Sequence, residues 1–89
     1  MLRIATETAG FATTVRLEGR LAGPWVDELA RTWLLLRTTG DTGSVRAELD
    51  GLTFVSPSGL SLLRRMYDEG AILVAHSCMT RAIVEEIRS

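Results

Sequence analysis

The sequence holds a single cysteine, Cys78, and a single histidine, His76, among its 89 residues. One cysteine excludes a disulfide within the chain, and one cysteine with one histidine is too little for an all-protein zinc site. A catalytic Cys–His pair needs a hydrogen bond and a stabilised thiolate, and the sequence indicates neither. A glycine-rich phosphate loop is also missing. We therefore expect a protein that is not an enzyme and that has no metal, no catalytic residues and no cofactor.

Long apolar runs and blocks of one charge are missing as well. No apolar run reaches the roughly 18 residues of a membrane-spanning helix, and Met1–Ile4 has a strand-like pattern rather than a signal-peptide core. The formal net charge is −1 and the charges are interspersed, so no basic block indicates nucleic acid or an anionic membrane. We expect a cytoplasmic protein that acts on a protein partner, without nucleic acid and without insertion into a membrane.

What the sequence does contain is typical of one small globular domain over residues 1–89. Its composition is 46% hydrophobic and 24% charged. A chain of this length buries only about 60–65% of the surface that its unfolded form exposes, so the core is modest.

Hydrophobic periodicity predicts seven elements. Alternation predicts strands at 2–8, 12–20 and 45–50, and the short connection around Gly10 predicts that the first two form an antiparallel hairpin. The apolar run 71–75 is typical of a strand buried on both faces. Helical spacing, proline in the first turn and serine caps predict helices at 24–38, at 57–68 and after Ser77.

This order predicts an α/β fold, because strands that alternate with helices are normally parallel. The expected architecture is a four-stranded mixed sheet with three helices, in which only the first two strands are antiparallel. We further expect Leu34–Leu36 to pack deeply, residues 19–23 and 38–43 to form loops, and the later helices to bury two sets of side chains: Leu60, Leu63 and Tyr67, and Met79, Ala82, Ile83 and Ile87.

Three loops are expected to gather where a partner binds. Ligands of such folds meet the carboxyl ends of parallel strands, and residues 20–24, 52–58 and 76–78 follow those ends. The central loop contains Ser56, Pro57, Ser58 and Gly59, which is the most distinctive chemistry in the chain.

Two interpretations of this loop are open. Ser56 at the N-cap accepts a hydrogen bond from the first turn, and Pro57 occupies the first helical position. A phosphate on Ser58 would be held by free N–H groups and the helix dipole, and it would add roughly −1.5 to −2 charges. The alternative is that both serines only cap and solvate the helix.

Two further residues near this edge have a functional and a structural interpretation. Trp25 is either a partner-binding anchor, since tryptophan is enriched in binding hot spots, or part of the core at the helix start. Arg20 either contacts a phosphate or an acidic partner, or is an ordinary solvated side chain. The candidate partner-binding set is therefore Arg20, Trp25, Ser56, Pro57, Ser58 and Gly59.

Three motifs together resemble the STAS domain, a family that includes bacterial anti-sigma factor antagonists. They are Leu17-Glu18-Gly19-Arg20-Leu21 at a strand end, Leu49-Asp50 in the third strand, and Ser56-Pro57-Ser58-Gly59-Leu60 at the turn. The resemblance covers nearly the whole chain and indicates a compact, divergent member. Where the family has an aspartate and then a serine, this chain has Ser56 and Pro57.

The resemblance implies a function and a partner. Family antagonists are phosphorylated on the serine before the turn glycine, which corresponds to Ser58. Unphosphorylated antagonists bind an anti-sigma factor kinase, and phosphorylation releases it. A second branch of the family implies an alternative: an accessory subunit of an ABC-type lipid transporter, bound to its ATPase. Neither the partner's identity nor the oligomeric state follows from the sequence.

Overall fold

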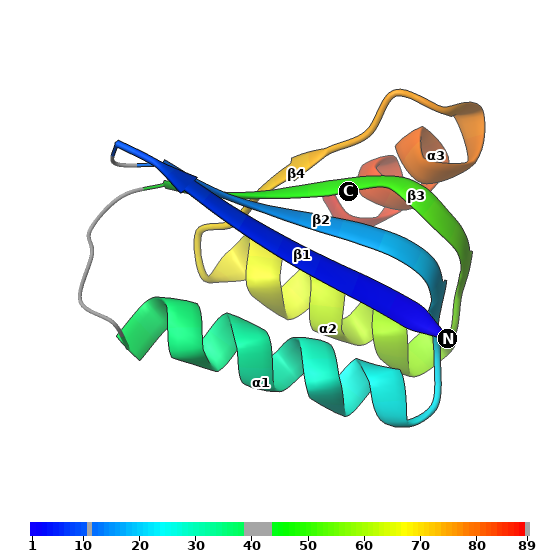
Figure 1. Ribbon diagram of the computed structural model, residues 1–89. Helices are drawn as coiled ribbons and strands as arrows, with labels where there is room; N and C mark the ends of the chain where they lie inside the picture. Colours follow the sequence, from blue (N-terminus) through cyan, green and yellow to red (C-terminus); the bar gives the residue numbers. More distant parts are fainter. Residues whose placement is uncertain (11, 39–43, 89) are drawn as a thin grey trace.

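The computed structural model describes residues 1–10, 12–38 and 44–88, and it contains four strands and three helices (Figure 1). The predicted α/β fold is confirmed. Residues 39–43 of the predicted polar loop lie outside the described part of the chain. The elements are β1 (Leu2–Ala9), β2 (Ala12–Leu21), α1 (Pro24–Thr38), β3 (Ser44–Val55), α2 (Pro57–Asp68), β4 (Ile72–Val74) and α3 (Cys78–Arg88).

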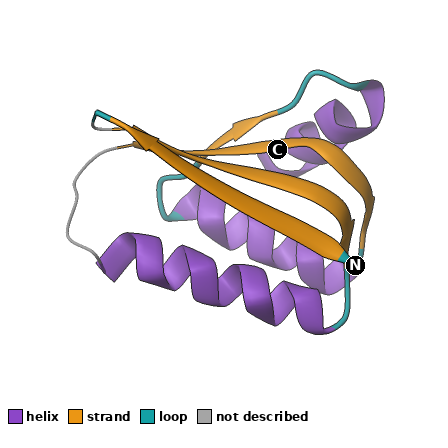
Figure 2. Ribbon diagram, in the orientation of Figure 1, coloured by secondary structure: helices purple, strands orange, loops and turns teal. Residues whose placement is uncertain are grey.

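The strands form one mixed sheet in the order β1-β2-β3-β4 (Figure 2). β1 pairs with β2 in antiparallel fashion, and the β2–β3 and β3–β4 pairs are parallel, as predicted. β1 and β4 are the two edge strands. α1 and α2 lie under one face of the sheet, and α3 packs against α2 and β3.

The core lies between the sheet and these helices. Side chains alternate along each strand, so Val15 and Leu17 of β2 and Ala47 and Leu49 of β3 are buried while Arg16 and Glu48 point to the other face. Each fully buried leucine contributes about 1.5–3 kcal/mol. The pattern gives the sheet one apolar face and one charged, open face.

β2 and β3 are longer than predicted, and their pairing is irregular. Residues 19–21 and 52–55 belong to strands, so the predicted loops at 19–23 and 52–58 shrink to short connections. Register shifts occur between Arg16 and Glu18 and again between Gly19 and Arg20. At the first shift, the buried positions of β3 change from odd numbers, Ala47 and Leu49, to an even number, Leu52. A simple alternation therefore predicted a strand that ended at residue 50.

The prediction that Leu34–Leu36 packs deeply is wrong for two of the three residues. The side chains of Leu34 and Leu35 are 58% and 59% exposed, whereas Leu36 is half-buried. Because successive residues turn by 100° around a helix, the face that carries Leu29 and Trp33 points inward and takes Leu36 with it. The same geometry directs Leu34 and Leu35 outward.

Three other burial predictions are also wrong. The strand predicted at 71–75 is a three-residue edge strand in which Ile72 is 45% exposed, because β4 has a neighbour on one side only. Tyr67 and Met79 are 37% and 44% exposed rather than buried. In α3, Ala82 is exposed and Thr80 and Val84 are buried with Ile87.

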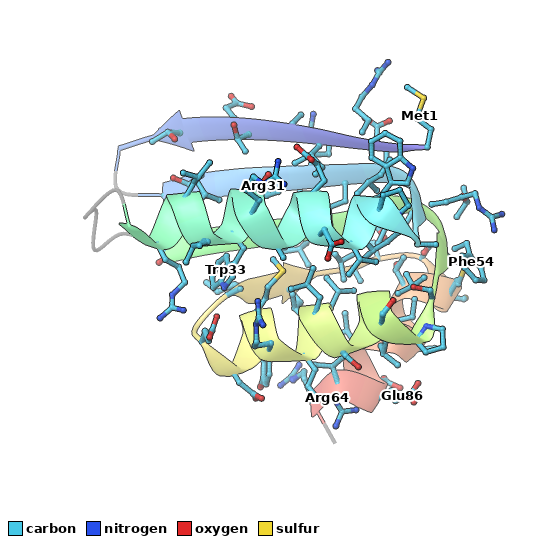
Figure 3. The ribbon with its side chains drawn as sticks, turned by 90° about the horizontal axis from the view of Figure 1, so that it is seen from below. Met1, Arg31, Trp33, Phe54, Arg64 and Glu86 are labelled. Atoms are coloured by element: carbon cyan, nitrogen blue, oxygen red, sulfur yellow. The ribbon has the colours of Figure 1, made fainter. Side chains whose placement is uncertain are left out.

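Polar contacts join α1 to the end of α2, and α2 to α3. The Trp33 indole N–H donates to Glu69 Oε1 at 2.6 Å, and Arg37 pairs with the same carboxylate at 3.0 Å. Arg64 of α2 donates to the backbone carbonyl of Glu86 in α3 at 3.5 Å, and Figure 3 shows the two residues side by side. The hydrogen bond from Trp33 lowers the pKa of Glu69, with Arg37 adding to the effect.

Candidate functional site

The turn at Ser56–Gly59 begins α2 and is organised by two serine hydroxyls. Ser56 is the N-cap, as predicted: its Oγ accepts the N–H of Gly59 at 3.1 Å. Ser56 Oγ and Ser58 Oγ share a hydrogen bond of 3.1 Å. Pro57 and Ser58 are exposed while Ser56 is half-buried. The Ser58 hydroxyl therefore lies in solvent, at the positive end of the helix dipole.

Gly59 fixes this turn against the end of β2. A Cβ at position 59 would lie 2.8 Å from the carbonyl oxygen of Leu21 and 2.9 Å from its Cγ. That same carbonyl accepts the N–H of Ser56 at 2.9 Å. Only glycine permits this approach, so the first of the three predicted loops, at 20–24, and the central loop do come together.

Arg20 and Phe54 form a second part of this edge. They are register partners in β2 and β3, and the Arg20 guanidinium lies 4.6 Å from the centre of the Phe54 ring. Phe54 is 41% exposed and projects from the end of β3 (Figure 3). Trp25 packs against the core but is only half-buried, so it agrees with neither the partner-binding nor the core interpretation alone. Phe54 is not among the predicted site residues, although an aromatic residue at a non-core position of a strand is a signal for it.

The third predicted loop, at 76–78, does not join the other two. It follows the short strand β4, and His76 and Ser77 lie beside Asp50, in the middle of β3. Asp50 Oδ1 accepts the N–H of His76 at 2.7 Å, the N–H of Ser77 at 3.0 Å and the hydroxyl of Thr80 at 2.9 Å, and Oδ2 lies 2.9 Å from His76 Nδ1. Ser77 is the predicted cap of α3, through a 3.3 Å bond from the N–H of Thr80. Asp50 thus holds the start of α3 to the sheet.

Acid is expected to weaken this attachment. The backbone N–H of His76, then that of Ser77, lower the pKa of Asp50. A carboxylate with a lowered pKa contributes stability above its unfolded pKa and loses it as the pH falls. Asp50→Asn should therefore lower the melting temperature at pH 7, and its deficit relative to wild type should shrink below about pH 4. Thermal unfolding from pH 7 to pH 2 measures this. Asp68→Asn, on the exposed side of α2, is the control; a deficit for Asp50→Asn that is constant with pH would contradict the prediction.

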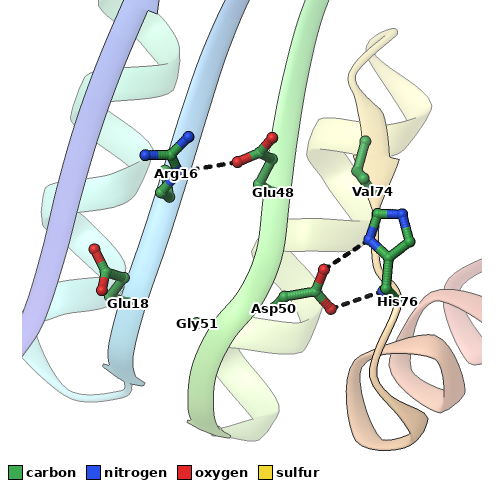
Figure 4. A pocket seen from close by; sticks show the side chains of 7 residues that line it. All are labelled: Arg16, Glu18, Glu48, Asp50, Gly51, Val74 and His76. Atoms are coloured by element: carbon green, nitrogen blue, oxygen red, sulfur yellow. Dashed lines mark hydrogen bonds and ion pairs between the residues drawn. The ribbon is translucent and has the colours of Figure 1, made fainter.

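A shallow hollow of about 230 Å³ lies on the open face of the sheet (Figure 4). It is lined by Arg16, Glu18, Glu48, Asp50, Gly51, Val74 and His76. Arg16 pairs with Glu48 there at 3.0 Å, and Asp50 pairs with His76.

Among residues 1–10, 12–38 and 44–88, no three His, Cys, Asp or Glu side chains are placed to hold a metal ion. In the same ranges, no helix is long and apolar enough to cross a membrane.

Comparison with solved structures identifies similar folds. An anti-sigma factor antagonist from Mycobacterium paratuberculosis matches with a TM-score of 0.82 and 16% identity, over 97% of this chain and 77% of that chain. The anti-sigma factor antagonist SpoIIAA in its unphosphorylated form matches with a TM-score of 0.59 and 14% identity, over 98% of this chain and 99% of that one. The protein Mglu matches with a TM-score of 0.63 and 19% identity, over 82% of this chain and 19% of its own length.

Comparisons by sequence gave a different outcome. Neither the protein-family models nor the curated protein sequences contain a match to this chain. The structural likenesses show that the chain has the STAS-like fold of the anti-sigma factor antagonists. At these identities they show the fold alone.

Proposed function

We propose that this chain is a non-catalytic protein–protein interaction module of bacterial regulation that acts in the cytoplasm like an anti-sigma factor antagonist. The observation that carries the proposal is the turn at Ser56–Gly59, which exposes Pro57 and Ser58, is hydrogen-bonded to the carbonyl of Leu21, and lies beside the exposed Arg20 and Phe54. An edge that exposes an aromatic residue and an arginine suits a protein partner, because both residue types are enriched in protein–protein interfaces. The chain's structural neighbours include two anti-sigma factor antagonists.

We further propose that phosphorylation of Ser58 switches this binding. Ser58 is exposed in the first turn of α2, where a phosphate would meet the helix dipole. The phosphate would also replace the hydrogen bond between Ser58 and Ser56 and add roughly −1.5 to −2 charges to the partner surface. The partner we propose is an anti-sigma factor kinase, which binds the unmodified chain and releases the phosphorylated one.

The test is incubation with a cognate anti-sigma factor kinase and ATP, followed by mass spectrometry. We expect one phosphate on the wild-type chain and none on Ser58→Ala. Ser61→Ala is the matched control: it removes another exposed hydroxyl in α2, one that bonds to the carbonyl of Pro57, and should leave phosphorylation unchanged. We expect Ser58→Asp to weaken kinase binding by about tenfold or more, since an added charge in an interface costs over 1.4 kcal/mol.

Other outcomes separate the proposal from its alternative. Phosphate on Ser56 or Ser61 in place of Ser58 would contradict the assignment of the site. Stable co-purification with the ATPase of an ABC-type lipid transporter, unaffected by Ser58→Asp, would replace the regulatory proposal with the accessory-subunit function. Kinase binding that ignores alanine substitutions at 54–60 would place the interface elsewhere.

A further inference from the structure

β1 is an edge strand whose outer side is open. Within residues 1–10, 12–38 and 44–88, its only strand partner is β2. A groove of about 350 Å³ separates it from α1, lined by Leu2, Ile4, Thr6, Glu28 and Thr32. Long exposed edges are sites where another strand can add, and proteins commonly block them with charges. β1 carries one charge of each sign, Arg3 and Glu7, so its charges can pair with those of a second strand rather than block it.

The hydrogen-bonding direction of each residue in β1 follows from its register. The N–H of Arg20 donates to the carbonyl of Met1 at 3.1 Å, and Leu2 pairs with Gly19. Hydrogen-bonded and non-hydrogen-bonded pairs alternate along an antiparallel ladder. Odd-numbered residues of β1 therefore direct their backbone groups toward β2. The even-numbered residues direct both N–H and C=O outward; they are Leu2, Ile4, Thr6 and Thr8.

The side chains of β1 divide the same way. Even-numbered residues face the helix side, where Leu2 is buried and Ile4 is half-buried. Arg3, Ala5 and Glu7 are exposed on the open face. Because Arg3 and Glu7 lie two positions either side of Ala5, the open face of this strand is self-complementary about Ala5.

We propose that the edge of β1 pairs with the β1 edge of a second copy of this chain, antiparallel and centred on Ala5. In this register Arg3 faces Glu7 of the second copy, and Glu7 faces its Arg3. The even-numbered residues exchange backbone hydrogen bonds, with Ile4 opposite Thr6 and Leu2 opposite Thr8. Charged pairs fall at non-hydrogen-bonded positions, where side chains are closest.

The other side of the strand supports the same register. Ile4 and Thr6 of the second copy would project into the groove between β1 and α1, where they cover the half-buried Ile4. Shifting the register by two residues in either direction places Arg3 opposite Ala5 or Ala9, and both charge pairs are lost. The two sheets would form one continuous eight-stranded sheet. The two turns that contain Ser58 would then face opposite ends of the strands.

Charge reversal tests this pairing by sedimentation velocity over a range of concentrations. We expect the wild-type chain to dimerise, and Arg3→Glu and Glu7→Arg each to weaken self-association by about tenfold or more, since both charged pairs become like-charged. Mixing the two variants should restore a dimer, because each then faces an opposite charge. Melting curves of each variant check folding, since Glu7 also lies near Arg16 of its own chain.

Cross-linking provides an independent test. In a Cys78→Ser background, Ala5→Cys should form a disulfide-linked dimer on mild oxidation, because paired Cα atoms at non-hydrogen-bonded positions are about 4.5 Å apart. Ala9→Cys is the matched control on the same strand and face, and its two copies would be about 27 Å apart. A wild-type chain that is monomeric at all concentrations, or equal cross-linking at positions 5 and 9, would overturn the proposal. Neither test depends on Ser58, so the proposed function stands or falls separately.

Discussion

Leu63→Ala is expected to lower the free energy of unfolding by about 3 kcal/mol, because it removes a fully buried side chain and leaves a cavity. Leu63 lies on the inner face of α2 and has 0% exposure. In a chain of this size, each kcal/mol shifts the melting temperature by roughly 4–8 °C. The loss should therefore be visible in a single thermal scan, and chemical denaturation measures its size.

Leu34→Ala is the matched control for this substitution. It removes the same atoms from α1, where the Leu34 side chain is 58% exposed. The expected change is within about 0.5 kcal/mol. Comparable losses for the two variants would mean that the outer face of α1 is covered, in contradiction to the fold described above.

Gly19→Ala is expected to have a similarly large effect, of about 3 kcal/mol, for two separate reasons. Gly19 has a φ of +103°, in the region that favours glycine, and a Cβ there would overlap the carbonyl oxygen of Met1. That carbonyl accepts the N–H of Arg20, so the substitution would also disturb the start of β1. Urea denaturation measures the loss in free energy.

Gly70→Ala separates the two reasons. Gly70 follows Glu69, the C-cap of α2, and has a φ of +111°; a Cβ there would have no neighbouring atom within 4 Å. Its substitution should cost only the backbone strain, about 1 kcal/mol. If both variants lose the same amount, the overlap with the Met1 carbonyl adds nothing to the cost of Gly19→Ala.

The two proposed surfaces have a joint consequence. The edge at Ser58 lies near the start of β1, because Arg20 bonds to Met1 and Ser56 bonds to Leu21. An antiparallel pairing through Ala5 would place the starts of the two β1 strands far apart. Each copy would then keep its Ser58 edge accessible, so a dimer is expected to bind two partner molecules. The mass of the complex in solution measures this stoichiometry.

Local chemistry determined much of what the sequence alone could predict. Alternating residues in 2–8, 12–20 and 45–50, the apolar run 71–75, and helical spacing after Pro24, Pro57 and Ser77 predicted the seven elements, because these signals act over a few neighbouring residues. The same signals located the Ser56–Gly59 turn. The resemblance to the STAS domain singled out Ser58 within it. The fold and the geometry of the turn agree with the structure; the role of Ser58 remains a prediction.

Tertiary structure decided what depends on residues far apart in the chain. The sequence contains Leu34, Leu35 and Ile72 as apolar residues, but their exposure depends on which face of α1 meets the sheet and on β4 being an edge. The pairing of Arg20 with Phe54 depends on two register shifts between β2 and β3, and the attachment of α3 depends on Asp50 reaching the loop before it. Local periodicity contains no information on register or on edges, since both arise only when strands distant in sequence pair.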